Sequence, residues 1–130
     1  MKNTWWFLVA GVVCLSASTS GHSQSLKAVA PLGGYVCMIL NLTNDQLRDN
    51  SLTVPVFNGP AASSGKAGVA SALLIVKSPL HVQNGFAETL FPDGRTVWIE
   101  ANMLRPYKSE SNPDARCTPS MMSDGKPGFG

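Results

Sequence analysis

Charged side chains are scarce in this sequence, and their scarcity excludes some classes of protein. Only 14% of the 130 residues are charged, and the formal net charge is +2. A nucleic-acid-binding surface needs a concentrated basic patch, and so small an excess of positive charge does not supply one. The sequence therefore predicts no nucleic-acid partner.

Residue types that bind metals or carry out catalysis are also few. Cys37, Cys117 and His81 are too few to complete a four-ligand zinc site. The acidic residues are scattered, most of them in predicted turns, and no two are placed as an acid–base pair. One catalytic alternative remains, in which His81 activates one of the two cysteines. We expect a non-enzymatic protein that uses no cofactor.

The apolar run at the N-terminus is too short to anchor the chain in a membrane. It covers residues 5–15, whereas a spanning helix needs about 20 apolar residues. Lys2 before the run and small residues at 16–21 after it are typical of a signal peptide. We predict a helical signal peptide at 1–23, a periplasmic or secreted mature chain, and no membrane span after cleavage. The alternatives are a buried N-terminal helix and a lipoprotein signal at Cys14.

Removal of the leader leaves two of the three cysteines. Cys37 and Cys117 lie 80 residues apart, and an even pair in an exported chain is typical of a disulfide. In the chain-entropy model, closing a loop of that length contributes at most about 4–5 kcal/mol. We predict this disulfide. The alternative is two unpaired thiols, with Cys37 buried as a small hydrophobic side chain.

Glycine and proline, by contrast, are frequent. The 12 Gly and 9 Pro favour a loop-rich β domain over a helix bundle. The clearest element is 84–99, which we interpret as two strands joined at Asp93-Gly94. Asp-Gly predicts a type I′ hairpin turn, because glycine adopts positive φ at no steric cost. The aromatic and β-branched residues on both sides suit a half-buried strand.

Three other segments predict strands. Residues 35–40 and 73–76 are continuous apolar runs, so we expect both to be central or covered strands. Residues 52–57 alternate as a strand does, but Pro55 cannot donate a hydrogen bond to a neighbour. This segment is therefore predicted to be an edge strand or an irregular one.

Two short helical turns are also predicted. Thr43 and Gln46 have the spacing of a capping box, which predicts one or two turns of helix. So short a helix is marginal without packing, and we expect Leu47 and Leu42 to anchor it. A further single turn is predicted at 100–104.

The length of the chain allows one domain. We predict a flexible lead-in at 24–33, a β domain at 34–107 and a polar tail at 108–130. The tail has too few apolar residues to offset the entropy of ordering itself, so it is expected to be irregular and tied by Cys117.

Residues 52–107 resemble bacterial SH3 domains, the small β-barrels attached to many exported cell-envelope proteins. Residues 52–60 resemble that family's first strand and loop, and 68–70 its entry into the next strand. Residues 84–104 resemble its Asn-Gly-aromatic strand, its hairpin, its Trp-Ile strand and its closing turn. The resemblance implies an all-β fold, a small SH3-like barrel of about five or six short strands. Phe86 stands where the family usually has Trp.

The resemblance also implies a function. We expect an exported, non-enzymatic SH3-like binding module that contacts peptidoglycan or an envelope protein. Aromatic side chains on one face would form the binding surface, and arginines near one end would hold a carboxylate through paired hydrogen bonds. The alternatives are that the aromatic residues are core and the arginines are surface charges. The candidate ligand-binding residues are Phe57, Phe86, Arg95, Arg105 and Tyr107.

A second functional hypothesis concerns the tail. The chain is then a small secreted structural or effector-like protein, and residues 112–130, tied by the disulfide, form its interaction element.

Overall fold

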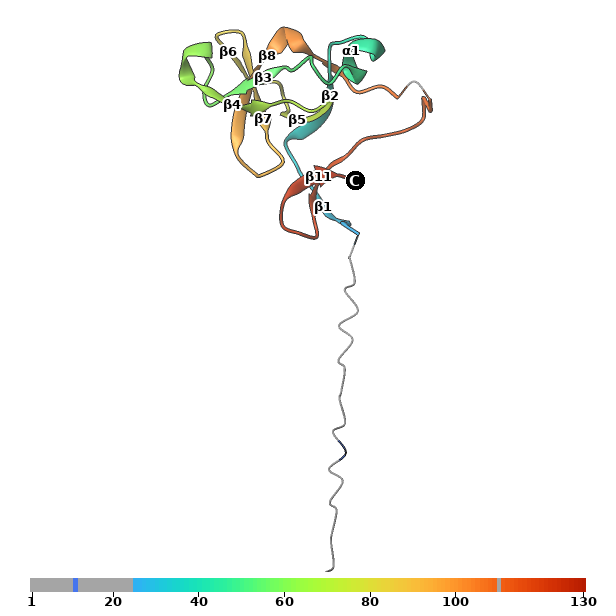
Figure 1. The fold of residues 1–130 in the computed structure, drawn as a ribbon. Coiled ribbons are helices and arrows are strands. Elements are labelled where there is room, and N and C mark those ends of the chain that lie inside the picture. Colours follow the sequence, from blue (N-terminus) through green and yellow to red (C-terminus); the bar gives the residue numbers. More distant parts are fainter. Residues whose placement is uncertain (1–10, 12–24, 110) are drawn as a thin grey trace, which may run out of the picture.

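The predicted all-β fold is confirmed by a computed structural model of the chain, which describes residues 11, 25–109 and 111–130. Strands dominate these residues and form two antiparallel sheets, and the helices are short (Figure 1). The predicted signal peptide at 1–23 lies outside the described residues, apart from Gly11.

The larger sheet contains the strands that run from β2 to β9. A short strand, β6, is added to this sheet by pairing antiparallel with β7 in a tight hairpin. In spatial order the strands are β4 (Lys66–Val69), β3 (Pro55–Phe57), β8 (Thr96–Glu100), β7 (Phe86–Leu90), β5 (Leu73–Lys77), β2 (Tyr35–Leu40) and β9 (Leu104–Pro106), with β6 (Val82–Gln83) beside β7.

The predicted closed barrel of about five or six strands is wrong. In the described part of the chain, β4 and β9 lie at the two ends of the strand order and each pairs on one side only. β9 ends at Pro106, which has no N–H to donate to a further strand. The ladder therefore stays open, although the sheet curls enough to enclose a common interior.

Alternation along the strands builds that interior. On β8, Val97 and Ile99 are almost fully buried, whereas the residues between and beside them point to the opposite face. Ala87 on β7 and Val76 on β5 face the same way. The core cluster consists of Leu40, Val54, Val56, Leu74, Val76, Ala87, Val97 and Ile99. The prediction that 73–76 forms a central strand is confirmed by β5, which lies between β7 and β2.

Pro55 has the effect that the sequence predicts. β3 pairs with β4 over its whole length but with β8 only at Phe57, and its ladder to β4 contains a register shift. β3 is therefore irregular, although it lies inside the sheet rather than at its edge.

The predicted capping box is confirmed. Helix α1 (Asn44–Arg48) begins after Thr43, whose hydroxyl accepts from the backbone N–H of Gln46, while the Gln46 side chain accepts from the backbone N–H of Thr43. Leu42 and Leu47 pack against the core and anchor the helix, as expected. Two single turns of 3₁₀ helix complete the helical content of the described residues, at Ala62–Ser64 and Ala101–Met103. The second of these is the turn predicted at 100–104.

The turn after β7 has a different geometry from the one predicted. Phe91 and Arg95 pair through a backbone hydrogen bond of 2.8 Å, and the N–H of Gly94 donates to the carbonyl of Phe91 at 2.9 Å. Gly94 has φ +90, but Asp93 does not have positive φ. This is the pattern of a three-residue loop, a type I turn closed by a left-handed glycine. Pro92 explains the difference, because its fixed φ suits the first central position of a type I turn.

A type I′ turn is present, but one connection earlier. Asn84 and Gly85 have φ 54 and 82, and they join β6 to β7 between the paired residues Gln83 and Phe86. Asn-Gly is a favoured pair for this turn, since both central residues need positive φ.

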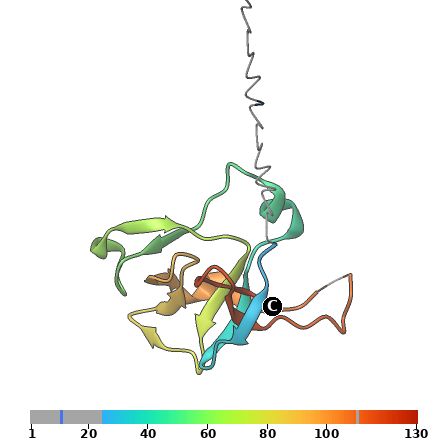
Figure 2. The same cartoon turned by 90° about the horizontal axis from the view of Figure 1, so that it is seen from below.

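The smaller sheet corrects two predictions. Part of the predicted flexible lead-in forms β1 (Ala28–Pro31), and part of the predicted irregular tail forms β10 (Pro119–Met122) and β11 (Pro127–Phe129). β10 lies between the other two. Figure 2 shows the blue N-terminal and red C-terminal segments side by side in this sheet. Neither segment has enough apolar residues to be recognised alone, and they become strands because they pair with each other from opposite ends of the chain.

The turn between β10 and β11 repeats the loop after β7. Met122 donates to Lys126 and the N–H of Gly125 donates to Met122, each at 2.9 Å, and Gly125 has φ +80. In both loops the Asp before the glycine accepts from the backbone N–H of the following basic residue, Lys126 in one and Arg95 in the other. The same Asp-Gly-basic sequence therefore forms the same loop in both sheets.

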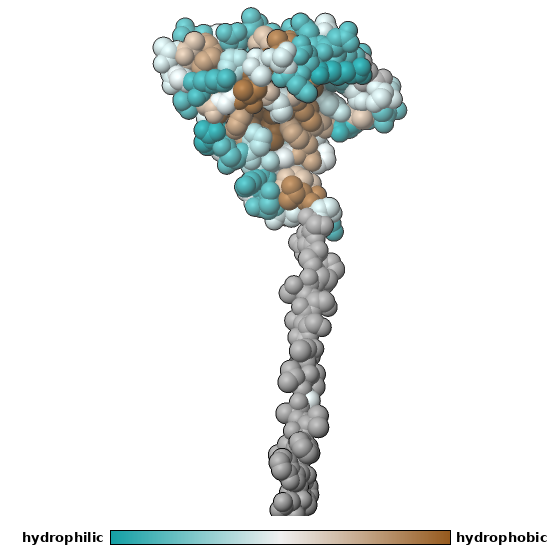
Figure 3. All heavy atoms as spheres, in the orientation of Figure 1, coloured by the Kyte–Doolittle hydropathy of each residue, from teal (hydrophilic) through white to brown (hydrophobic). Residues whose placement is uncertain are grey.

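The smaller sheet lies against the outer face of the larger one. Leu90 and Phe91 share a hollow of about 150 Å³ with Pro127 and Phe129. Hydrophobic side chains gather where the two sheets meet (Figure 3). The tail thus covers apolar side chains at the end of β7.

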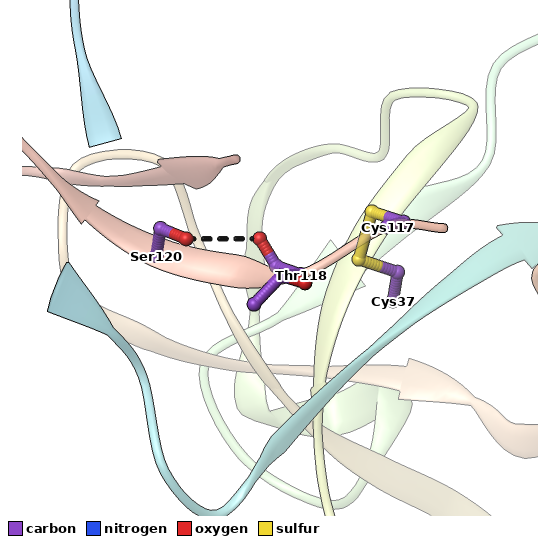
Figure 4. Close-up of a disulfide and its surroundings, with 4 residues drawn as sticks. All are labelled: Cys37, Cys117, Thr118 and Ser120. Carbon is purple, nitrogen blue, oxygen red and sulfur yellow. Dashed lines mark hydrogen bonds between the residues drawn. A yellow bond between two sulfur atoms is a disulfide. The ribbon is translucent and has the colours of Figure 1, made fainter. Parts of the chain in front are cut away.

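The predicted disulfide is confirmed. Cys37 on β2 and Cys117, two residues before β10, are bonded, with their Cα atoms 6.0 Å apart (Figure 4). Cys37 is 2% exposed. Beyond the bridge, the hydroxyl of Ser120 donates to the carbonyl of Thr118 at 3.0 Å. The bridge fixes the smaller sheet to β2, the neighbour of the terminal strand β9 in the larger sheet.

Candidate functional site

A row of aromatic and charged residues crosses the outer face of the larger sheet, and we name it the aromatic–charged row. The register pairs Tyr35 with Lys77, Glu88 with Trp98, and Trp98 with Phe57. Lys77 and Glu88 close the remaining gap with an ion pair of 3.3 Å. Five strands thus contribute one residue each.

Strand alternation places the row opposite the core. The chain neighbours of its members, including Val56, Val76 and Val97, are buried in the core cluster. Because successive side chains of a strand point to opposite faces, the row points outward. Phe57, Glu88 and Trp98 are half-buried, which leaves part of each side chain open to solvent.

His81 completes the centre of the row. Its Nδ1 lies 2.8 Å from Oε2 of Glu88, and its ring meets that of Trp98 edge-on at 5.5 Å between centroids. The Gln83 side chain reaches its other nitrogen, with 3.3 Å between the two Nε2 atoms. The hydrogen bond from His81 holds the pKa of the Glu88 carboxyl below its usual value; Lys77 adds to this effect and burial opposes it.

Phe86 supports the row from beside it. Its ring packs edge-on against Phe57 with 5.6 Å between centroids, and Phe86 is only 8% exposed. Of these two predicted binding residues, Phe57 belongs to the outward row, whereas Phe86 serves as buried packing.

The structure places the other three predicted binding residues with different partners. Arg95 pairs with Asp93 at the loop after β7, and its guanidinium lies 5.5 Å from the centre of the Phe91 ring. Arg105 on β9 donates to the backbone carbonyls of Leu40, the last residue of β2, and of Leu42 just beyond it. Tyr107 lines a hollow beside the disulfide. The predicted set therefore does not form one site; the structure brings Phe57 and Phe86 together.

The centre of the row does not follow from the local sequence. His81 carries no predicted partner beyond the two cysteines, and Glu88 is one of the scattered acidic residues, yet the two lie 2.8 Å apart. The signal was the alternation of β8, which puts Trp98 opposite Val97 and Ile99. With the correct three-residue loop after β7, the register also places Glu88 directly across from Trp98.

The described residues offer little for metal or thiol chemistry. They contain no group of three or more His, Cys, Asp or Glu side chains arranged to hold a metal ion. Cys37 and Cys117 are joined to each other, so the alternative in which His81 activates one of them lacks a free thiol. None of the helices among the described residues is long and apolar enough to cross a membrane.

No family model, curated protein or solved structure shows a significant match to this chain. The chemistry of the row is thus the guide to function. Aromatic faces stack on flat apolar surfaces, and a carboxylate, an ammonium and an imidazole beside them bind polar groups.

Proposed function

We propose that this protein is an exported, non-enzymatic SH3-like binding module whose aromatic–charged row contacts peptidoglycan, or else a protein of the cell envelope. The carrying observation is that side chains from five strands align in one row on the outer face, opposite the core. The predicted leader and the disulfide fit an oxidising, exported environment.

The composition of the row favours binding to a ligand with both apolar and polar faces. Sugar rings have such faces, because their C–H groups stack on aromatic rings while their hydroxyl groups hydrogen-bond to charged side chains. Trp98 and Phe57 supply the first kind of contact, and Glu88 and Lys77 supply the second.

The row is also held in place before a ligand arrives. Glu88 is fixed by Lys77 and His81, and Phe57 by Phe86. Side chains that are already ordered lose less conformational entropy on binding, which favours affinity.

A pull-down on purified cell wall tests the proposal. We expect the full chain to be retained at low salt and Trp98→Ala to lose most of that retention, since stacked aromatics dominate such interfaces. Phe129→Ala is the matched control, because it removes an aromatic ring that is 36% exposed but lies on the smaller sheet. No retention of the unchanged chain would rule out peptidoglycan as the ligand. Equal losses of retention in both variants would rule out the aromatic–charged row as the binding surface.

A second candidate function places the interaction element in the disulfide-tied tail. It is favoured by the long segment from β9 to β10, which runs out to one side of the molecule in both views and is mostly exposed. Deleting everything after Tyr107 would also remove β10, β11 and the partner of Cys37. The sharper test exchanges the exposed residues Asn112, Asp114 and Arg116 for Ser, which leaves both sheets intact. Retention unchanged by this triple variant contradicts the tail hypothesis.

A further inference from the structure

A hollow whose charged residues are all basic lies between α1, β2, β9 and the segment that follows β9. It measures about 380 Å³. Arg48, Arg105 and Lys108 contribute to its walls, and no described acidic residue does. Ile39 and Leu47 form its apolar part, while Asn44 and Ser111 add polar groups.

Arg105 is the fixed part of this hollow. Its Nε donates to the carbonyl of Leu40 at 3.3 Å and its Nη2 to the carbonyl of Leu42 at 3.4 Å. These two hydrogen bonds are long, and they orient the guanidinium while occupying only some of its N–H groups. A guanidinium carries five N–H groups, so after two donations three remain to meet a ligand.

The three cations have no acidic partner among the described residues. The ion pairs there join Glu88 to Lys77 and His81, and Asp93 to Arg95. Glu110, which follows Lys108 by two positions, lies outside the described residues. Positive charges gathered around a concave surface raise the local concentration of anions.

We propose that this hollow binds one carboxylate or phosphate group, with Arg105 as the oriented donor and Arg48 and Lys108 as the flanking cations. A planar guanidinium end matches two oxygens of either group. The proposal is independent of the aromatic–charged row, because the two share no residue; they have only strand β2 in common, from which Tyr35 belongs to the row and Ile39 to the hollow. A failure of the anion site would therefore leave the proposed function untouched.

The test is a titration of the ¹⁵N-labelled full chain with inorganic phosphate and, separately, with sodium acetate. Sodium chloride keeps the ionic strength constant, so general screening is matched between samples. We expect saturable shifts of the Arg105 Nε–H signal and of the backbone amides of Arg48 and Lys108. Saturation by one anion alone identifies the group, and saturation by both supports an oxyanion site that accepts either.

Variants separate a site from general attraction. The double variant Arg48→Met, Lys108→Met leaves the Arg105 hydrogen bonds in place and should weaken binding about tenfold. Arg116→Met is the control, because it removes an exposed arginine that lies outside this hollow. The proposal is overturned if neither anion saturates, or if Arg116→Met weakens binding as much per charge as the double variant does.

Discussion

The two sheets of this protein are stabilised in different ways. The larger sheet encloses a cluster of aliphatic side chains, of which Val56, Val76 and Ile99 are wholly buried. In the smaller sheet all four residues of β1 are exposed, and only Pro119 and Ser120 are buried. The larger sheet thus depends on packing, whereas the smaller one depends on backbone pairing and on the disulfide that fixes it to β2. Similar strand pairing thus rests on different sources of stability within one chain.

The largest expected difference between the sheets is the effect of truncating a side chain. Ile99→Ala should lower the free energy of unfolding by about 2–5 kcal/mol, because it leaves a cavity in the core cluster. Met121→Ala on β10 removes a half-buried side chain and should cost less than about 1 kcal/mol. Urea denaturation of both variants measures the difference, and equal losses would show that the smaller sheet is also held by packing.

Removing the disulfide should separate the two sheets. In Cys37→Ala, Cys117→Ala we expect a loss of about 2–4 kcal/mol. Hydrogen exchange should speed up at the amides of β10 and β11 while those of β8 stay protected, since the core does not include the bridge. Uniform loss of protection in both sheets would mean that they unfold as one unit.

The shared loop allows the same substitution to be made in each sheet. Gly94→Ala and Gly125→Ala both force a side chain into positive φ, at a local cost of about 1–2 kcal/mol. We expect Gly94→Ala to lower global stability, and Gly125→Ala to speed exchange only within the smaller sheet. Gly33→Ala is the control, because a Cβ there meets open space at an ordinary φ, and its effect should be near zero.

The smallest effect concerns pH and the aromatic–charged row. The pKa of Glu88 is lowered in the folded chain from a usual value of 4.5. Its stabilising contribution is therefore complete above pH 4.5 and is lost as pH falls through the lowered folded pKa. Glu88→Gln should remove that part of the acid sensitivity, whereas Glu100→Gln, exposed at the end of β8, should retain it. Denaturation midpoints measured from pH 7 to pH 3 are the check, and parallel profiles for Glu88→Gln and the unchanged chain would contradict the assignment.

The sequence predicted the larger sheet well because its strands carry their own signals. The apolar runs at 35–40 and 73–76, the hairpin around Pro92 and the capping box of α1 are all local patterns, and each appears at its predicted place. Closure of the sheet was not predictable in the same way, since it depends on whether the terminal strands β4 and β9 meet in space.

The smaller sheet and the site depended on long-range pairing. Ala28 and Met122 pair across most of the chain, and neither segment shows a strand pattern alone. The row likewise needed the register between β7 and β8, which the loop geometry at Gly94 sets. His81 could not be placed from its neighbours in sequence, because its partners Glu88 and Trp98 are fixed by that register.

The bond between Cys37 and Cys117, which are 80 positions apart, closes the segment between them into a covalent ring. This ring contains nearly the whole larger sheet. Proteases cut exposed connections such as the glycine-rich stretch around Ser63. A single cut inside the ring opens it but releases no fragment, so the clipped protein keeps its mass apart from one added water. After a cut in a surface loop, the strands on either side therefore remain covalently joined through the disulfide and can pair again.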